Sequence, residues 1–100
     1  MEKQTVVAAL AALAQETRLD AFRALVEAGP DGLPAGELAA ALGLPSATLS
    51  FHLKELRNAG LVRRERAGRS RIYRPDFAAV RQLVDYLTEN CCRASRRRRA

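Results

Sequence analysis

The chain has 100 residues and a mass of 11.0 kDa, which is enough for one domain with a single modest core. Hydrophobic residues make up 48% of it, a fraction that excludes wholesale disorder. The longest apolar run, Val6 to Ala14, is far shorter than the roughly 20 residues of a membrane-spanning helix. No basic-then-apolar leader opens the sequence, so we expect a cytoplasmic protein.

The net charge of +6 is concentrated in two stretches of the chain. Residues 54–74 carry a net charge of +6 and residues 93–100 carry +5, whereas residues 1–53 carry −3 and residues 75–92 carry −2. Basic patches on a nearly neutral body predict a polyanionic partner. Nucleic acid and an anionic membrane surface both satisfy this expectation.

Apolar residues at helical spacing predict four helices in the first 60 residues. We expect Leu19, Phe22, Leu25 and Val26 to be buried on the second helix. Ser46 is positioned to cap the start of the fourth helix, and Gly60 to end it. The expected helices span Gln4–Ala14, Glu16–Ala28, Ala35–Leu42 and Ser46–Ala59.

The periodicity changes after Gly60. Two short β-prone runs, 61–66 and 69–74, flank Ala67-Gly68 and predict a hairpin. A last helix, 77–89, follows with Asp76 as its cap. The predicted fold is mainly α with a small β-hairpin, a winged helix-turn-helix of five helices and a two-stranded wing. Residues 1–92 form its single domain, and 93–100 form a basic tail that we expect to be disordered.

The fourth helix has the character of a DNA recognition helix. Its leucines lie on one face, and the other face is small or polar near the start and cationic further along. A glycine-containing turn between two helices can present the second helix to a major groove. The alternative is an amphipathic helix whose polar face is simply exposed to solvent. The basic hairpin that follows favours DNA binding. The candidate DNA contacts are Ser46, Thr48, Ser50, Phe51, His52 and Lys54 on the helix and Arg69 and Arg71 on the hairpin.

Several stretches resemble the ArsR/SmtB family of bacterial winged-helix metalloregulators. They are residues 16–25, 38–44 and above all 46–56 (Ser-Ala-Thr-Leu-Ser-Phe-His-Leu-Lys-Glu-Leu), with 59–62 and 71–73 extending the match through the wing. The resemblance covers about residues 4–92. It implies a homodimer paired through the first and last helices, a recognition helix at 46–59, and repression that an inducer relieves.

The apolar pattern supports a dimer independently. The first and last helices carry more apolar surface than one small core uses, and a protein interface would cover the remainder. The candidate interface residues are Val6, Leu10 and Leu13 on the first helix and Val80, Leu83, Val84 and Leu87 on the last.

The sensor sites of the family are largely absent. Residues 35–46 lack the Cys-x-Cys pair of many arsenic-responsive members, and the last helix lacks the histidine that the family's zinc site needs. What remains is Cys91-Cys92, which resembles the C-terminal vicinal pair of another arsenic-sensing branch without its third cysteine. The resemblance implies that this pair binds a trivalent arsenical or antimonite as the inducer, with no obligatory cofactor.

The chemistry of adjacent cysteines is compatible with that role. In a cytoplasmic protein such a pair is more often reactive or ligating than a structural disulfide, and adjacent residues strain an S–S ring. At a helix C-terminus the dipole disfavours a thiolate by about 0.3–1 kcal/mol, so a strongly activated catalytic thiol is not expected. A soft ion displaces thiol protons as it binds. The third position around arsenic would be filled by an exogenous thiol, a carbon substituent or a cysteine of the partner subunit.

Three other functions remain in competition. The same cysteines could sense oxidants or reactive sulfur, and a winged helix could bind proteins instead of DNA. An enzyme is not expected, because no Cys–His dyad signature, carboxylate pair or phosphate loop is present. The expected partners are therefore operator DNA and a second copy of the chain, with no membrane.

Overall fold

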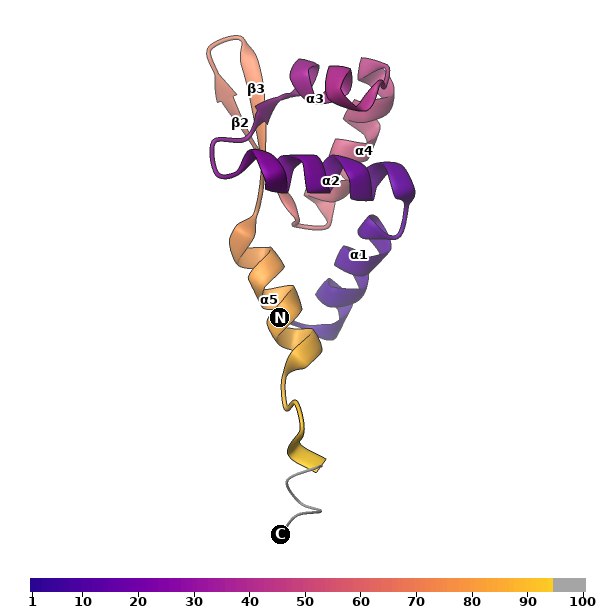
Figure 1. Cartoon of the computed structure of the whole chain (residues 1–100), viewed down its shortest axis with the longest axis vertical. Coiled ribbons are helices and arrows are strands. Elements are labelled where there is room, and N and C mark those ends of the chain that lie inside the picture. The colour runs from indigo at the N-terminus through magenta and orange to yellow at the C-terminus, as the bar shows by residue number, and fades with distance from the viewer. Residues whose placement is uncertain (95–100) are drawn as a thin grey trace.

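The structure, a computed structural model, describes residues 1–94. The expected arginine tail therefore falls mostly outside the described residues. Five helices and a small antiparallel sheet form the winged helix-turn-helix that the sequence predicts (Figure 1). In chain order they are α1 (Lys3–Leu13), α2 (Glu16–Ala28), β1 (Leu33–Pro34), α3 (Ala35–Leu42), α4 (Ser46–Asn58), β2 (Val62–Ala67), β3 (Ser70–Pro75) and α5 (Phe77–Thr88).

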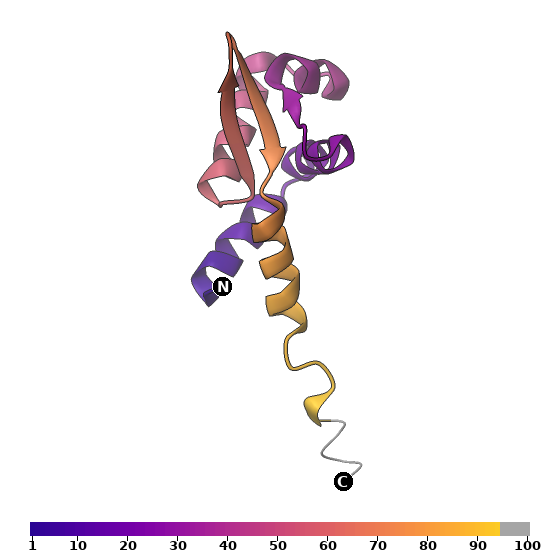
Figure 2. The ribbon, with the colours of Figure 1, turned by 90° about the vertical axis from the view of Figure 1, so that its left-hand side faces the viewer.

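The core is formed by α2, α3, α4 and the sheet, and α1 and α5 add buried residues to it: Val6, Ala9, Ala12 and Leu83. Leu25, Leu38, Leu53 and Leu56 are at most 1% exposed, and burying each leucine side chain contributes about 1.5–3 kcal/mol. Helices α1 and α5 contact each other at the other end of the molecule (Figures 1 and 2). Within residues 1–94, no helix combines the length and the apolar character needed to cross a membrane.

The helix boundaries follow local hydrogen bonding. Asp76 caps α5 as predicted, with its Oδ1 accepting a bond from the Ala79 amide at 3.0 Å. The prediction that Ser46 caps α4 is wrong, because Pro45 occupies the cap position and no side chain bonds there. Gly60 ends α4 with φ +79°, and the Leu61 amide donates to the Leu56 carbonyl at 3.0 Å. This arrangement is a Schellman motif.

The sheet has the order β1-β3-β2, so the wing gains a third strand that was not predicted. Strand β1 has only two residues, too few for a period-2 pattern. The hairpin turn is Gly68-Arg69, one residue later than predicted, because Ala67 pairs with Ser70. Gly32 precedes β1 with φ +70°, and a Cβ there would clash with the carbonyl oxygen of Tyr73. Only glycine fits that position.

The buried face of α2 is rotated from the one predicted. Phe22 and Leu25 are buried as expected, but Leu19 and Val26 are 42% and 41% exposed. Fully buried Ala21 belongs to the inner face instead. A small alanine at the contact lets α2 approach its neighbours closely, which moves the two larger side chains to the flank of the helix.

Candidate nucleic-acid interface and thiol pair

Helix α4 is anchored by one face and free on the other. Leu49, Leu53 and Leu56 are at most 1% exposed and fix the helix against the core. The turn before it is tight, since Gly43 adopts a left-handed conformation that ends α3. Five of the six contact residues predicted on this helix are exposed: Ser46, Thr48, Ser50, Phe51 and Lys54. The start of α4 and the tip of the wing lie at the same end of the molecule (Figures 1 and 2).

His52 lies at the flank of this exposed face and is half-buried. Its ring meets that of Phe51 edge-on, with centroids 5.6 Å apart. Among the described residues, its Nδ1 is buried without a hydrogen-bond partner.

The wing carries arginines in directly opposed pairs. Arg66 pairs with Arg71, and Arg63 pairs with Arg74. Opposed residues of antiparallel strands share one face of the sheet, and like charges in that position destabilise the hairpin. A phosphate placed between two such guanidinium groups would relieve the repulsion.

The two arginine pairs differ in how their charge is balanced. Glu65 forms an ion pair with Arg74, which partly neutralises the inner pair. The outer pair, Arg66 and Arg71, has no carboxylate bonded to it within residues 1–94. Its side chains, and that of Arg69 in the turn, are exposed. Of the two opposed pairs, the one without a bonded carboxylate is therefore the pair nearer the tip of the wing.

Sequence reasoning named Arg69 and Arg71 but missed Arg66. The pairing of Arg66 with Arg71 depends on the position of the turn, and the weak Ala-Gly pattern placed the turn one residue early. The positive φ of +63° at Gly68 is what allows the observed turn.

The predicted interface residues separate into two groups in the structure. Val6 and Leu83 are buried in the core of the single chain, and Leu13 and Val80 are half-buried. The remaining three predicted residues are exposed, and so is Val7, which was not predicted. Exposed fractions are 59% for Val7, 41% for Leu10, 52% for Val84 and 56% for Leu87.

The cysteine pair lies beyond α5 and does not close that helix as predicted. Helix α5 ends at Thr88, and Cys91 and Cys92 occupy a turn in which both are exposed. The helix dipole therefore has less effect on these thiols than predicted, since its influence falls off within the last helical turn. The two Sγ atoms are 3.0 Å apart. Two thiols that sequence reasoning could only place next to each other in the chain are thus also adjacent in space.

The hydrogen bond between the two thiols changes the acidity of one of them. The contact with Cys92, together with slight desolvation, raises the pKa of Cys91. Both effects favour the protonated form. Cys91 therefore lacks the lowered pKa of an activated catalytic thiol.

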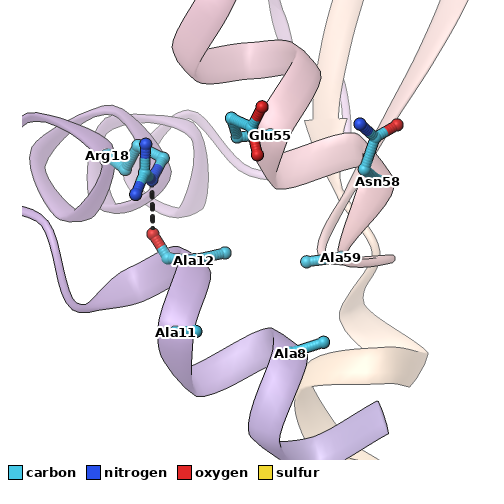
Figure 3. A pocket seen from close by; sticks show the side chains of 7 residues that line it. All are labelled: Ala8, Ala11, Ala12, Arg18, Glu55, Asn58 and Ala59. Atoms are coloured by element: carbon cyan, nitrogen blue, oxygen red, sulfur yellow. Dashed lines mark hydrogen bonds between the residues drawn. The ribbon is translucent and has the colours of Figure 1, made fainter.

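A cavity of about 260 Å³ separates α1 from the C-terminal half of α4 (Figure 3). Alanines of α1 form one wall, and Glu55 and Asn58 of α4 form the other. Arg18 of α2 also lines the cavity. Its Nε donates a hydrogen bond to the Ala12 carbonyl near the end of α1, at 2.8 Å. The contact between α1 and α4 is consequently incomplete.

The chain is similar to known transcriptional regulators over most of its length. A family model described as a helix-turn-helix domain matches residues 13–65, which includes α2, α3 and α4. The HTH-type transcriptional regulator NmtR of Mycobacterium tuberculosis is 42% identical over 80 residues, which are 80% of this chain. The chain spans 64% of the length of that relative.

Solved structures extend the likeness to the whole fold. An ArsR-like transcriptional regulator from Rhodococcus is 28% identical with a TM-score of 0.80, over 94% of this chain and 86% of that one. The homodimeric winged helix-turn-helix DNA-binding domain of a Mycobacterium bovis protein is 26% identical with a TM-score of 0.67, over 88% and 86%. The chain belongs to the ArsR/SmtB family of winged helix-turn-helix transcriptional regulators.

Proposed function

We propose that this protein is a homodimeric DNA-binding repressor that leaves its operator when a trivalent arsenical or antimonite binds Cys91 and Cys92. One observation carries the DNA-binding part. The start of α4 and the tip of the wing lie at one end of the molecule (Figure 1), and their polar and basic residues are exposed. There a helix can enter the major groove while guanidinium groups contact phosphates.

The homodimer is supported by the apolar side chains that α1 and α5 leave exposed. Val7 and Leu10 lie on one helix, Val84 and Leu87 on the other, and the two helices are in contact. A dimer built on them would present two copies of α4 to half-sites about one helical turn, ~34 Å, apart. The Mycobacterium bovis domain to which this chain is similar is homodimeric, which supports a homodimer here.

The inducer is proposed from the chemistry of the thiol pair. Trivalent arsenic and antimony are soft and favour sulfur ligands, and two thiols 3.0 Å apart can bind one such atom. The turn that holds the pair follows α5, at the opposite end of the molecule from the start of α4 and the tip of the wing (Figure 1). A ligand bound there does not compete with DNA directly. It must instead favour a dimer arrangement whose recognition helices are badly spaced, a coupling typically worth ~1–3 kcal/mol.

The route for that coupling is a series of packed helices. Helix α5 contacts α1, and α1 contacts α4. The cavity beside Ala8, Ala11 and Ala12 leaves space for α1 to shift relative to α4. A change in the α5 contacts at the dimer interface would thereby alter the position of the recognition helix.

The direct test is operator binding by fluorescence anisotropy under reducing conditions. We expect arsenite, a methylated arsenical or antimonite to weaken binding by the wild-type protein. The double variant Cys91→Ser/Cys92→Ser should bind DNA equally well and ignore all three ligands. Release of the double variant by any of them would show that the cysteines are not the sensor.

A second candidate is a sensor of oxidants or reactive sulfur at the same cysteines. The short distance between the two Sγ atoms favours it, because a sulfenic acid formed on one thiol by peroxide would condense with the other, releasing water. Peroxide or a persulfide donor added to the same assay separates the two candidates. Release by oxidants combined with indifference to arsenicals would favour the second.

A further inference from the structure

One large apolar side chain is exposed on the helix assigned to DNA recognition. Phe51 is 56% exposed, in the second turn of α4. Within residues 1–94, the other exposed large apolar side chains lie at Met1 or on α1, α2 and α5, and none lies on α3 or the wing. The dimer interface proposed on α1 and α5 lies toward the other end of the molecule from the start of α4, so it does not cover Phe51 (Figure 1).

The backbone of Phe51 is fixed, and its ring has a neighbour that orients it. Leu49, Leu53 and Leu56 pack α4 against the core and are at most 1% exposed. The ring of Phe51 meets that of His52 at 67°, with centroids 5.6 Å apart. An edge-to-face contact of this kind is stabilising. Contact with the half-buried His52 therefore favours one orientation of an otherwise exposed phenyl ring.

The neighbours of Phe51 toward the start of α4 are small. Residues three and four apart are neighbours on a helix surface, which places Ala47 and Thr48 one turn before Phe51. Both are exposed, and each carries a methyl group. Side chains on a helix lean toward its N-terminus, so the phenyl ring extends over this turn. The three residues present a small apolar surface on the part of the helix that meets base edges in helix-turn-helix proteins.

An apolar surface distinguishes thymine from the other bases. In the major groove, thymine presents a C5 methyl group, whereas guanine, adenine and cytosine present hydrogen-bonding groups alone. A phenyl ring placed over those polar edges would remove water from groups that it cannot pair. Against the thymine methyl, the same ring buries apolar surface of both partners.

We infer that Phe51 is a specificity-determining residue that selects one thymine in each operator half-site by contact with its C5 methyl group. This inference rests on the DNA-binding part of the proposed function and is independent of the inducer. Each chain contributes one such side chain on α4, and a dimer presents two copies of that helix. The selected thymines should therefore occupy equivalent positions in the two half-sites.

The test begins with selection of bound sequences from a library of random duplexes, using the reduced protein without any metalloid. Each thymine of the selected sequence is then replaced by deoxyuridine, which differs only by the missing methyl group. Fluorescence anisotropy measures the affinity for every duplex. At one equivalent pair of positions, the replacement should weaken binding by about 4-fold in one half-site and about 15-fold in both, as expected for one or two buried methyl groups.

Variants assign the sensitive thymine to Phe51. Phe51→Ala should bind the selected duplex more weakly and bind its thymine and uracil forms equally. Lys54→Ala is the matched control on the same exposed face, and it should weaken binding to both forms while preserving their ratio. Both positions are exposed, so thermal unfolding should be nearly unchanged in either variant.

A second pair of duplexes isolates the methyl group from the rest of thymine. The sensitive position is occupied by 5-methylcytosine in one duplex and by cytosine in the other, each paired with guanine. We expect wild type to prefer the methylated duplex by about the same 4-fold per half-site, and Phe51→Ala to bind both equally. Equal binding of the two duplexes by wild type would contradict readout through the methyl group.

The outcomes distinguish this inference from the proposed function. A preferred sequence in which uracil is tolerated at every thymine, or in which Phe51→Ala is as sensitive to uracil as wild type, would overturn the inference and leave DNA recognition intact. Selection that yields no preferred sequence would contradict both. Methyl sensitivity that is lost in Phe51→Ala and kept in Lys54→Ala supports both.

Discussion

The DNA-facing end of the molecule and the thiol end hold their functional side chains in different ways. Helix α4 is packed against the core by leucines that are at most 1% exposed. Its outer face is therefore held in a fixed position relative to the core. Cys91 and Cys92 lie past the end of α5, fully outside the core, and turn hydrogen bonds position them. The DNA-facing end is thus a recognition helix held rigidly by the core, and the thiol end is a local turn that follows a helix.

This difference implies that the two activities can be altered separately. A substitution in the turn leaves the core untouched, whereas a substitution beneath α4 affects folding and recognition together. The two ends meet through the contact of α5 with α1. Substitutions can therefore test each end, and the connection between them, in turn.

The largest effect is expected beneath α4. Leu53→Ala removes a buried side chain and should lower the free energy of unfolding by about 2–5 kcal/mol. Cys91→Ser should change it by less than about 0.5 kcal/mol. Urea unfolding followed by circular dichroism measures both. Equal decreases would mean that the thiol end contributes to the core after all.

The next largest effect concerns the apolar face of α1 and α5 that we assign to the dimer interface. Val84→Asp places a charge on an exposed side chain of α5, and we expect a folded monomer, because a dimer would bury that charge without a partner. Leu83→Asp should instead destabilise the single chain, since Leu83 is only 6% exposed. Sedimentation velocity and thermal unfolding distinguish the two. A dimeric Val84→Asp protein would contradict the assigned interface.

The wing should govern affinity for all DNA sequences. Replacing Arg66 and Arg71 by alanine should weaken binding and reduce the slope of log K against log salt by about 0.9 for each phosphate that the variant no longer neutralises. Arg23→Ala, on the exposed side of α2 and ion-paired with Glu27, is the matched control and should leave the slope unchanged. An unaltered slope in the double variant would remove the wing from the interface.

A smaller effect in the opposite direction is expected at Glu65. Glu65→Gln removes the carboxylate that is paired with Arg74 and frees that guanidinium for phosphate. The salt slope should steepen by up to about 0.9, while discrimination between operator and unrelated duplex should fall. Titrations at several salt concentrations measure both quantities. Weaker binding would indicate that Glu65 serves to hold Arg74 in its binding position.

The smallest effect is a shift in the pH profile of thiol reactivity. The hydrogen bond with Cys92 raises the pKa of Cys91, so its thiolate forms at higher pH than usual. Cys92→Ala removes that bond and should move the alkylation profile of Cys91 to lower pH. Iodoacetamide rates between pH 7 and 10, roughly spanning the ordinary thiol range, report the shift. An unchanged profile would show that the contact with Cys92 does not raise the pKa of Cys91.

The sequence predicted the elements whose side chains carry strong periodic patterns. The bounds of α2 and α3, and the Asp76 cap of α5, agree with the structure, because helical spacing and capping chemistry are local. The exposed face of α4 was predictable for the same reason. Its leucines recur at helical spacing and leave the polar residues on the other side.

The features that were missed depend on contacts between distant residues. Strand β1 forms only because Leu33 and Pro34 pair with β3. No local sequence pattern predicts that pairing. The opposition of Arg66 and Arg71 depends on a turn position that shifts with one residue. The exposure of Leu19 and Val26 reflects how closely Ala21 lets α2 approach the core. The proximity of the two Sγ atoms likewise requires the turn geometry, since adjacent residues in an extended chain point apart.

The central claim is that arsenical binding at the thiol end and DNA binding at the other end oppose each other. Linkage makes this reciprocal, so operator DNA must weaken arsenical binding by the factor by which the arsenical weakens DNA binding. The direct measurement is the affinity of the dimer for a phenylarsenical, by competition with a dithiol, with and without saturating operator. We predict a reduction of about 5–150-fold on adding DNA. The same affinity in both conditions would contradict the account.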